Sequence, residues 1–342
     1  LRLLGLDCEE TFKSDASLRA YEVGFAEYLR NEAAKTERPV KIPTPLGMEA
    51  KKFAVEFFEG VTQVRLERDH PKDLRDRYNR YLAYAFAKKD GKWVNYNVEC
   101  VRAGMSPYFT KYGHATRFHD EFVAAQDEAR AAKRGIWEPG TEHYTDYDVR
   151  LAWWNARGDF VTQFQNDASK RDDLITLTHW DSLYRLEGMV GDEVEILATV
   201  GDIRLGKGGA PTRAMLSRRM FSDFAIVFFD DEVFTASRIA NAKGEFVRVR
   251  GTVSEYEFRG KRGKRGDKVL QMVVRHAEQV SFVDAWGMAA ALMPAAGSAP
   301  PGDPTVPDPE TPQPPLEAPF EPTPETLAPP VTDEAPPPLP AG

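Results

Sequence analysis

Apolar residues recur with two different periods over the first 137 residues. Leu1, Leu3 and Leu6 flank a glycine and predict a short buried strand. Alternating segments predict further strands at 61–67 and 77–87, and Lys89-Asp-Gly-Lys92 predicts a hairpin turn. Apolar residues three or four positions apart predict helices at 15–35, 48–59 and 119–132, and residues 93–103 are predicted to be the end of a strand that passes into a helix. The pattern therefore predicts an α+β part, mainly β with helices added to a small sheet.

A second group of alternating segments follows residue 187. Strands are predicted at 192–203, 223–229, 246–253 and 268–274, with a short helix at 235–242. Ahead of them, residues 138–186 carry aromatic residues at roughly helical spacing. We interpret 138–186 as a helical connector and 187–285 as a second small β-barrel domain. An OB-fold is the favoured form of this barrel, although any small antiparallel barrel has a similar pattern.

The end of the chain differs in composition from the rest. Residues 294–342 hold 18 of the 25 prolines and eight acidic residues, without Lys or Arg. Such a segment lacks the apolar surface needed to order itself, so we predict an extended, disordered tail that is free to bind other proteins. Without these eight residues the net charge of –8 becomes zero. Nucleic-acid binding would therefore have to depend on local basic patches.

Other composition features narrow the class of protein only slightly. Cys8 and Cys100 are too few for a disulfide framework, and both lie in apolar patterns typical of buried free thiols. The six histidines are scattered and have no spacing that predicts a zinc site. No apolar run is long enough to cross a membrane. The chain opens on Leu1 inside a strand, so we expect residues upstream, and location is left open, with secretion or the cell envelope as one alternative.

Two stretches bring charged residues to strand ends. The segment Leu1–Glu10 carries Arg2, Asp7 and Glu10 close together in the sequence. A second segment, Asp76-Arg-Tyr-Asn-Arg80, precedes an apolar strand. A cation beside two carboxylates is suited to binding a hard metal ion and a phosphate. Each such residue alone is usually a solvated surface charge. Their joint pattern is what favours a site.

These two stretches, with Gly135-Ile-Trp137 at the end of a helix, resemble the thermonuclease (staphylococcal nuclease-like) family. Its signature is an R-L-L-G-x-D-x-x-E strand, a D-R-Y-G-R-x-L-A-Y strand and a helix ending in G-I-W. The resemblance covers residues 1–137, with an insertion at about 14–44. It implies an OB-type β-barrel with three helices. The family's first two strands, one of which supplies a further aspartate to calcium, would lie before Leu1.

The resemblance implies catalytic roles for three residues. Arg2 and Arg80 match the two arginines that clamp the phosphate, a task that suits a planar and permanently charged guanidinium. Glu10 matches the glutamate that orients or deprotonates the attacking water. Asp76 matches an aspartate of the arginine motif, with either a structural role or a weak supporting role behind the catalytic residues.

The resemblance also implies a Ca2+ site. Asp7 matches a calcium-ligand aspartate, and Cys8 stands where a threonine usually offers its backbone carbonyl, which survives the substitution. Glu9 replaces a proline, and we expect this change to loosen the turn that holds Glu10.

Several further residues are candidates for contacts with nucleic acid. Tyr78, Tyr108 and Tyr112 are placed to stack on a base, with core or rim packing as an equal alternative. Two glycine-rich basic loops of the second domain are favoured to approach a phosphate backbone, against the alternative of solvated hairpin tips. The nucleic-acid candidates in these loops are Arg218, Arg219, Arg259, Lys261, Arg262, Lys264 and Arg265.

Together these features predict a Ca2+-dependent nuclease that hydrolyses DNA and RNA, with the second barrel holding the substrate. The alternative is a catalytically inactive nuclease-like scaffold that binds nucleic acid or protein partners. Retention of Arg2, Asp7, Glu10 and Arg80 favours the enzyme.

Overall fold

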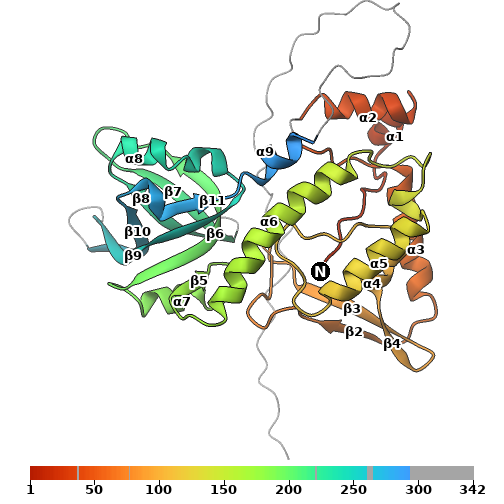
Figure 1. The fold of residues 1–342 in the computed structure, drawn as a ribbon, viewed down its shortest axis with the longest axis horizontal. Helices are drawn as coiled ribbons and strands as arrows, with labels where there is room; N and C mark the ends of the chain where they lie inside the picture. Colours follow the sequence, from red (N-terminus) through yellow and green to blue (C-terminus); the bar gives the residue numbers. More distant parts are fainter. Residues whose placement is uncertain (37, 77, 220–221, 260–264, 293–342) are drawn as a thin grey trace, which may run out of the picture. The chain divides into compact units, whose positions relative to one another are not determined.

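The computed structural model describes residues 1–36, 38–76, 78–219, 222–259 and 265–292. These residues belong to one compact unit, Leu1–Pro294. The segment 294–342, for which the sequence predicts a disordered tail, lies outside the described residues, as do Lys261, Arg262 and Lys264. Within the described ranges, no helix combines the length and apolarity that crossing a bilayer requires. Figure 1 shows the helices and strands in chain order.

A four-stranded sheet organises the first part of the chain. Its strands are β1 (Arg2–Leu3), β2 (Val64–Glu67), β3 (Leu82–Lys89) and β4 (Lys92–Asn95). Strand β3 is central: β1 pairs with it in parallel, whereas β2 and β4 pair with it antiparallel. The predicted hairpin turn is confirmed at Asp90 and Gly91, which have positive φ of 48° and 77°. Among the described strands this sheet is open at its edges.

Helical segments lie between and after these strands in the first part of the chain. They are α1 (Asp15–Tyr21), α2 (Phe25–Ala33), α3 (Pro45–Phe58), α4 (Tyr96–Arg102), α5 (His119–Ala131) and the 3-10 turn η1 (Gly135–Trp137). The inserted segment forms two helices instead of the single predicted one, because Gly24 has φ of +96° and interrupts the helical path. Helix α3 starts at Pro45 and is capped by Thr44, whose hydroxyl accepts from Gly47 N at 3.0 Å.

The G-I-W motif has a clear packing role. A side chain at Gly135 would lie 2.2 Å from the Gly104 carbonyl oxygen, and Ile136 N donates to the same oxygen at 2.9 Å. Only glycine allows this close backbone approach at its φ of +53°. The motif therefore locks the end of α5 to the end of α4.

The connector is one long helix, α6 (Tyr147–Ala168), followed by β5 (Leu174–Thr176) and α7 (Ser182–Glu187). Helix α6 buries residues on several sides, including Trp154 and Phe164, which are 2% and 1% exposed. It packs against α9 (Ala285–Ala290) through Trp153 and Trp286, whose rings lie 5.3 Å apart. The aromatic residues spaced along this segment in the sequence are thus the buried residues of a helix that packs on more than one face.

A closed five-stranded barrel forms the second part. The strands are β6 (Glu193–Arg204), β7 (Thr212–Arg219), β8 (Ser222–Phe228), β9 (Phe246–Arg259) and β10 (Arg265–Val274). They pair in the circuit β6-β7-β8-β10-β9-β6, in which β8 and β10 are parallel and the other pairs antiparallel. Helix α8 (Asp231–Ala236) and η2 (Ile239–Ala242) join β8 to β9, while η4 (Ala277–Gln279) and β11 (Val280–Phe282) follow β10.

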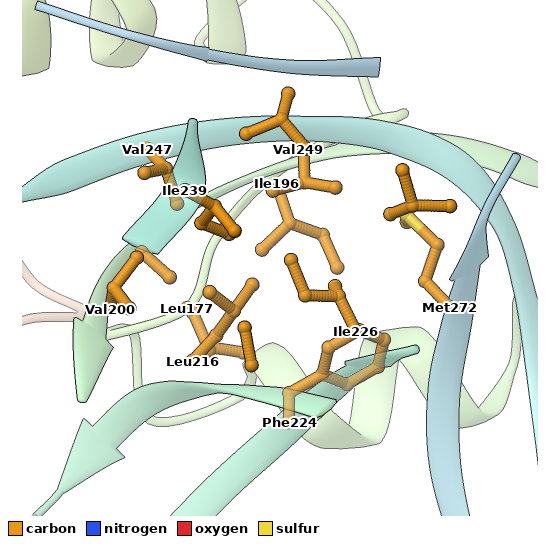
Figure 2. Close-up of a cluster of buried hydrophobic side chains, with 14 of the residues drawn as sticks. Leu177, Ile196, Val200, Leu216, Phe224, Ile226, Ile239, Val247, Val249 and Met272 are labelled. Carbon is orange, nitrogen blue, oxygen red and sulfur yellow. The ribbon is translucent and has the colours of Figure 1, made fainter. Parts of the chain in front are cut away.

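The interior of this barrel is filled by branched and aromatic side chains, as Figure 2 shows. Ile196, Leu216, Ile226 and Val249 come from four different strands and are fully buried. Inward-facing residues from every strand close the core, so the predicted small barrel is confirmed. A Greek-key barrel of five strands is also the form of an OB-fold, and that finer assignment stays a prediction.

The structure corrects the first basic loop of the second domain. Arg218 and Arg219 were expected to lie in a loop but lie in strand β7. Thr212, Ala214 and Leu216 are buried and alternate with the less buried Arg213 and Met215. Two of these three inward-facing residues are small or polar. The alternation of apolar and polar residues that predicts a strand is therefore not evident in the sequence.

Candidate active site

The segment after β1 is held rigidly by the core beneath it. Gly5 has φ of +70°, and a side chain there would lie 2.6 Å from the Phe122 ring. Its carbonyl accepts from Phe109 N at 3.0 Å, and Asp7 N donates to Ser106 Oγ at 2.9 Å. This explains the glycine in the motif and fixes the direction in which Asp7 leaves the sheet.

Asp7 lies between two cations. Arg2 Nη2 donates to Asp7 Oδ1 at 3.2 Å and to the Leu6 carbonyl at 3.0 Å. Lys41 Nζ donates to Asp7 Oδ2 at 2.7 Å. The Asp7 side chain is only 10% exposed, whereas that of Lys41 is 55% exposed. Both carboxylate oxygens are therefore engaged, one of them by a lysine that the inserted segment supplies.

This arrangement bears directly on the calcium site that the resemblance implies. Ca2+ takes about six to eight oxygen ligands and is attracted by uncompensated carboxylates. Asp7 offers one carboxylate, already neutralised by Arg2 and Lys41. The residues present fit Ca2+ only once the Lys41 ammonium leaves Asp7 Oδ2. Because Lys41 is more than half exposed, it would move into water at little cost.

Glu9 does the opposite of what the sequence suggested. It is 5% exposed and accepts from Tyr144 N and Tyr147 Oη, each at 2.7 Å, and from the Thr44 hydroxyl. Burial raises the pKa of the Glu9 carboxyl above its usual value, while these hydrogen bonds oppose the rise. Glu9 therefore anchors the turn to α6 and to the start of α3 instead of loosening it.

Glu10 follows directly and points the other way. Its side chain is 48% exposed, with Lys13 Nζ at 3.7 Å. Its backbone is fixed, since its carbonyl accepts from Thr44 N at 3.1 Å and Gly47 packs against that oxygen. A solvated carboxylate on a fixed backbone is suited to taking a proton from water.

The arginine motif is a turn instead of the strand predicted from residue 77. Asp76 Oδ1 accepts from Tyr78 N and Arg80 N, each at 2.9 Å, and Asn79 has φ of +65°. This carboxylate-capped turn replaces strand pairing, so β3 begins only at Leu82. The structural role expected of Asp76 agrees with these contacts.

Arg80 is paired with the same aspartate. Its Nη2 and Nε lie 2.6 and 2.7 Å from Asp76 Oδ2, and its guanidinium carbon lies 5.4 Å from the Tyr78 ring centroid. Arg80 and Tyr78 are 45% and 52% exposed. Arg2 N donates to Tyr81 O at 2.8 Å, so the backbones of the two arginine segments are adjacent.

The two other tyrosine candidates differ in environment. Tyr108 is buried and stacks on Phe122 at 4.8 Å, so the core-packing alternative holds for it. Tyr112 is 58% exposed and contacts Phe109 and Phe246 edge-on, at 5.7 and 6.3 Å. Tyr112 is therefore available at a surface formed partly by the barrel.

A pocket of about 320 Å3 opens beside Asp7. Cations outnumber carboxylates in its lining, and they come from the insertion, the connection between α4 and α5, α6 and the segment before β9: Arg38, Lys41, Lys111, Arg150, Arg157 and Lys243. Burial lowers the pKa of Lys111 to about 7, and the neighbouring charges of Arg157 and Lys41 act in the same direction. Lys111 Nζ lies 4.0 Å from the Trp153 ring centroid. A pocket of this charge is suited to an anionic group.

Pattern reasoning missed Lys41, Lys111 and Arg157, because each gains its role from a contact distant in the sequence. Arg157 is 4% exposed and paired with Glu245 of the barrel, which is 7% exposed. Burial lowers the pKa of Arg157, and the Glu245 charge opposes that shift. This pair joins α6 to the start of β9.

The basic candidates of the barrel lie at the end of the barrel away from the pocket beside Asp7. Arg218 and Arg219 end β7, while Arg259 ends β9 and Arg265 begins β10. Because β8 and β10 run in parallel, the β7–β8 and β9–β10 connections lie at the same end. Lys243, which lines the pocket, precedes β9 and so lies at the opposite end from Arg259.

Comparison with known proteins finds similarity over the first part of the chain. The family model described as "Staphylococcal nuclease homologue" matches residues 1–139. Three curated relatives are each 31% identical: uncharacterized protein MJ1439 of Methanocaldococcus jannaschii over 137 residues, and the SPbeta prophage-derived endonuclease YokF and endonuclease YncB of Bacillus subtilis over 110 residues each. The matches cover 40%, 32% and 32% of this chain. They span 60%, 35% and 49% of those relatives, less than two thirds of each.

Proposed function

We propose that this chain, in which residues 1–139 form a staphylococcal nuclease-like domain, is a nuclease that hydrolyses phosphodiester bonds in DNA and RNA. The observation that carries the proposal is the group at the end of β1. There Arg2 and Asp7 are in contact at 3.2 Å, and Glu10 presents a half-exposed carboxylate on a fixed backbone. Two relatives named as endonucleases support the same reaction class and favour cleavage within strands.

The residues divide the chemistry between them. Glu10 takes a proton from the attacking water, whose oxygen bonds to phosphorus while the bond from phosphorus to the leaving oxygen breaks. The leaving oxygen then takes up a proton. Arg2 and Arg80 donate to the phosphate oxygens, whose charge is greatest in the transition state. Asp7 orients Arg2 through their ion pair.

Calcium dependence is the finer part of the proposal. Asp7 and the backbone carbonyl of Cys8 would hold the ion once Lys41 has withdrawn. The chemistry supplied by bound Ca2+ is neutralisation of charge beside the scissile phosphate. The cationic pocket beside Asp7 would bind a neighbouring phosphate, and Tyr112, which contacts the lining residue Phe109, would stack on a base. The basic end of the barrel is the proposed second contact with the strand.

The proposed function is tested by incubating the full chain with single- and double-stranded DNA and RNA, in Ca2+ and in EDTA. We expect cleavage in Ca2+ and none in EDTA, with Glu10→Gln prepared in parallel to exclude a contaminating nuclease. Retained binding without any cleavage by the wild-type chain would instead support the nuclease-like scaffold. The observation that favours this alternative is that Asp7 and Arg80 are both engaged in ion pairs.

Replacing Lys41 with methionine is expected to strengthen Ca2+ binding roughly fivefold, because a partly exposed ion pair contributes about 1 kcal/mol. Calorimetric titration with Ca2+ measures this independently of cleavage. Lys52→Met is the matched control, since Lys52 belongs to an exposed pair with Glu56 elsewhere. The contrary outcome has two parts: Lys41→Met leaves the Ca2+ affinity unchanged, and the wild-type chain cleaves in EDTA whereas Lys41→Met does not. This outcome would show that Lys41, and not Ca2+, supplies the positive charge beside Asp7.

A further inference from the structure

Three metal-ligating side chains converge away from the site described above. His70 and Asp73 lie between β2 and the arginine motif, whereas His179 lies between β5 and α7. One ligand atom from each lies within 4.8 Å of the others. The two imidazole rings stack with centroids 4.7 Å apart and planes 15° from parallel. No spacing in the sequence pointed to this cluster, because the histidines come from different parts of the chain.

The surrounding contacts hold the two segments together. Trp180 N donates to Lys72 O at 3.1 Å, and Lys72 Nζ lies 2.7 Å from Asp181 Oδ2. Thr178 Oγ1 donates to Asp73 Oδ1 at 3.1 Å, which orients that carboxylate and leaves its Oδ2 toward His179. Neighbouring backbone and side-chain contacts therefore hold the cluster in place. These contacts leave the candidate ligand atoms free, except for one hydrogen bond to a nitrogen of His70.

Polar atoms of this cluster are buried without partners. His179 Nε2 and Asp181 Oδ1 have no hydrogen-bond partner within the described part of the chain. Asp73 Oδ2 lies 3.9 Å from His179 Nε2, too far for a hydrogen bond. At His70, Nδ1 accepts from Lys72 N at 3.1 Å, so an ion bound there would replace one hydrogen bond. An unpaired buried imidazole nitrogen, beside a carboxylate oxygen too distant to bond it, indicates a missing ligand.

The donor set identifies the class of that ligand. Two imidazole nitrogens and one carboxylate oxygen suit Zn2+ and neighbouring transition metals, whereas Ca2+ and Mg2+ prefer oxygen alone. Bonds of about 2.0 Å in a tetrahedral site place ligand atoms about 3.3 Å apart. The ligand atoms lie at most 4.8 Å apart, so metal binding would bring them closer by at most about 1.5 Å. Rotation of the partly exposed His70 and Asp73 side chains allows this movement. A fourth position remains for water.

We propose that His70, Asp73 and His179 bind one divalent transition-metal ion of the Zn2+ class. The ion joins the segment that leads into the arginine motif to the segment that leads into α7. It thereby fastens the nuclease-like domain to the barrel part of the same compact unit. This proposal does not depend on nuclease activity, and it concerns residues separate from those proposed to hold Ca2+.

The experiment uses the full chain without a histidine tag, stripped of metal with a chelator and dialysed. Titration with Co2+ reports d–d absorption bands of a tetrahedral site, and competition with Zn2+ gives the affinity for zinc. Thermal unfolding is followed in parallel with and without Zn2+. The variants are His179→Gln and Asp73→Asn, and His276→Gln is the control for loss of an exposed histidine.

We expect one ion per wild-type and His276→Gln chain and a higher Tm with Zn2+. His179→Gln and Asp73→Asn are each expected to bind at least about 100-fold more weakly, with no Zn2+-dependent rise in Tm. If His179→Gln fails to fold, Asp73→Asn decides the outcome alone. Absence of tetrahedral Co2+ bands in the wild type, or equal Zn2+ affinity in Asp73→Asn and the wild type, would overturn the proposal.

Discussion

Replacing Arg80 with alanine is expected to lower kcat/KM for DNA and RNA cleavage by about 10³-fold. The guanidinium is proposed to donate to phosphate oxygens that gain charge in the transition state, and alanine offers no substitute. The protein should stay folded, because the Arg80 pair with Asp76 is 45% exposed on the arginine side and such pairs contribute about 1 kcal/mol or less. Arg2 is a poorer test, since it also holds the Leu6 carbonyl and Asp7.

A matched control lies in the same turn. Arg75 contacts Asn79 O at 3.2 Å and stacks on Tyr81, with its guanidinium carbon 3.9 Å from the ring centroid. Arg75→Ala should retain cleavage within a few-fold of the wild type, and Arg80→Lys should recover little, because lysine lacks the planar fork. Steady-state cleavage of a labelled oligonucleotide, with urea unfolding of each variant, measures both properties. Cleavage by Arg80→Ala within tenfold of the wild type would exclude Arg80 from the catalytic group.

Removing Arg157 is expected to lower the free energy of unfolding by about 3–5 kcal/mol, because an uncompensated carboxylate is left buried. Arg157 and Glu245 are 4% and 7% exposed, and Arg157 also donates to Lys111 O at 3.1 Å. Glu245 would then keep its ion pair with the partly exposed Arg38, at 3.4 Å. Urea unfolding at pH 7 of Arg157→Met measures the loss.

The double variant separates charge from packing. Arg157→Met combined with Glu245→Gln removes both charges and should recover part of the stability, which a double-mutant cycle quantifies. Arg171→Met breaks an exposed pair with Asp173 and should unfold close to the wild type. If Arg157→Met is as stable as Arg171→Met, the buried pair does not hold α6 to the barrel.

The chemistry of the site was predictable where a motif carries it locally. Arg2, Asp7 and Glu10 lie within one strand end, and the turn of Asp76–Arg80 is closed by its own aspartate. The partners of these residues were not predictable. Lys41 reaches Asp7 from the inserted segment, and Glu9, expected to loosen its turn, is buried against Tyr144 and Tyr147. Their roles depend on burial and on neighbours distant in the sequence.

The sequence by itself determined the strands and helices with a clear apolar period, the arginine and carboxylate motifs, and the presence of a second small barrel. These depend on contacts between residues a few positions apart, which periodicity records. Only the tertiary structure decided that β7 is a strand, that cations from four segments line the pocket beside Asp7, and that His70 and His179 stack. Such features arise when the chain folds back on itself, and no local pattern encodes which distant side chains then meet.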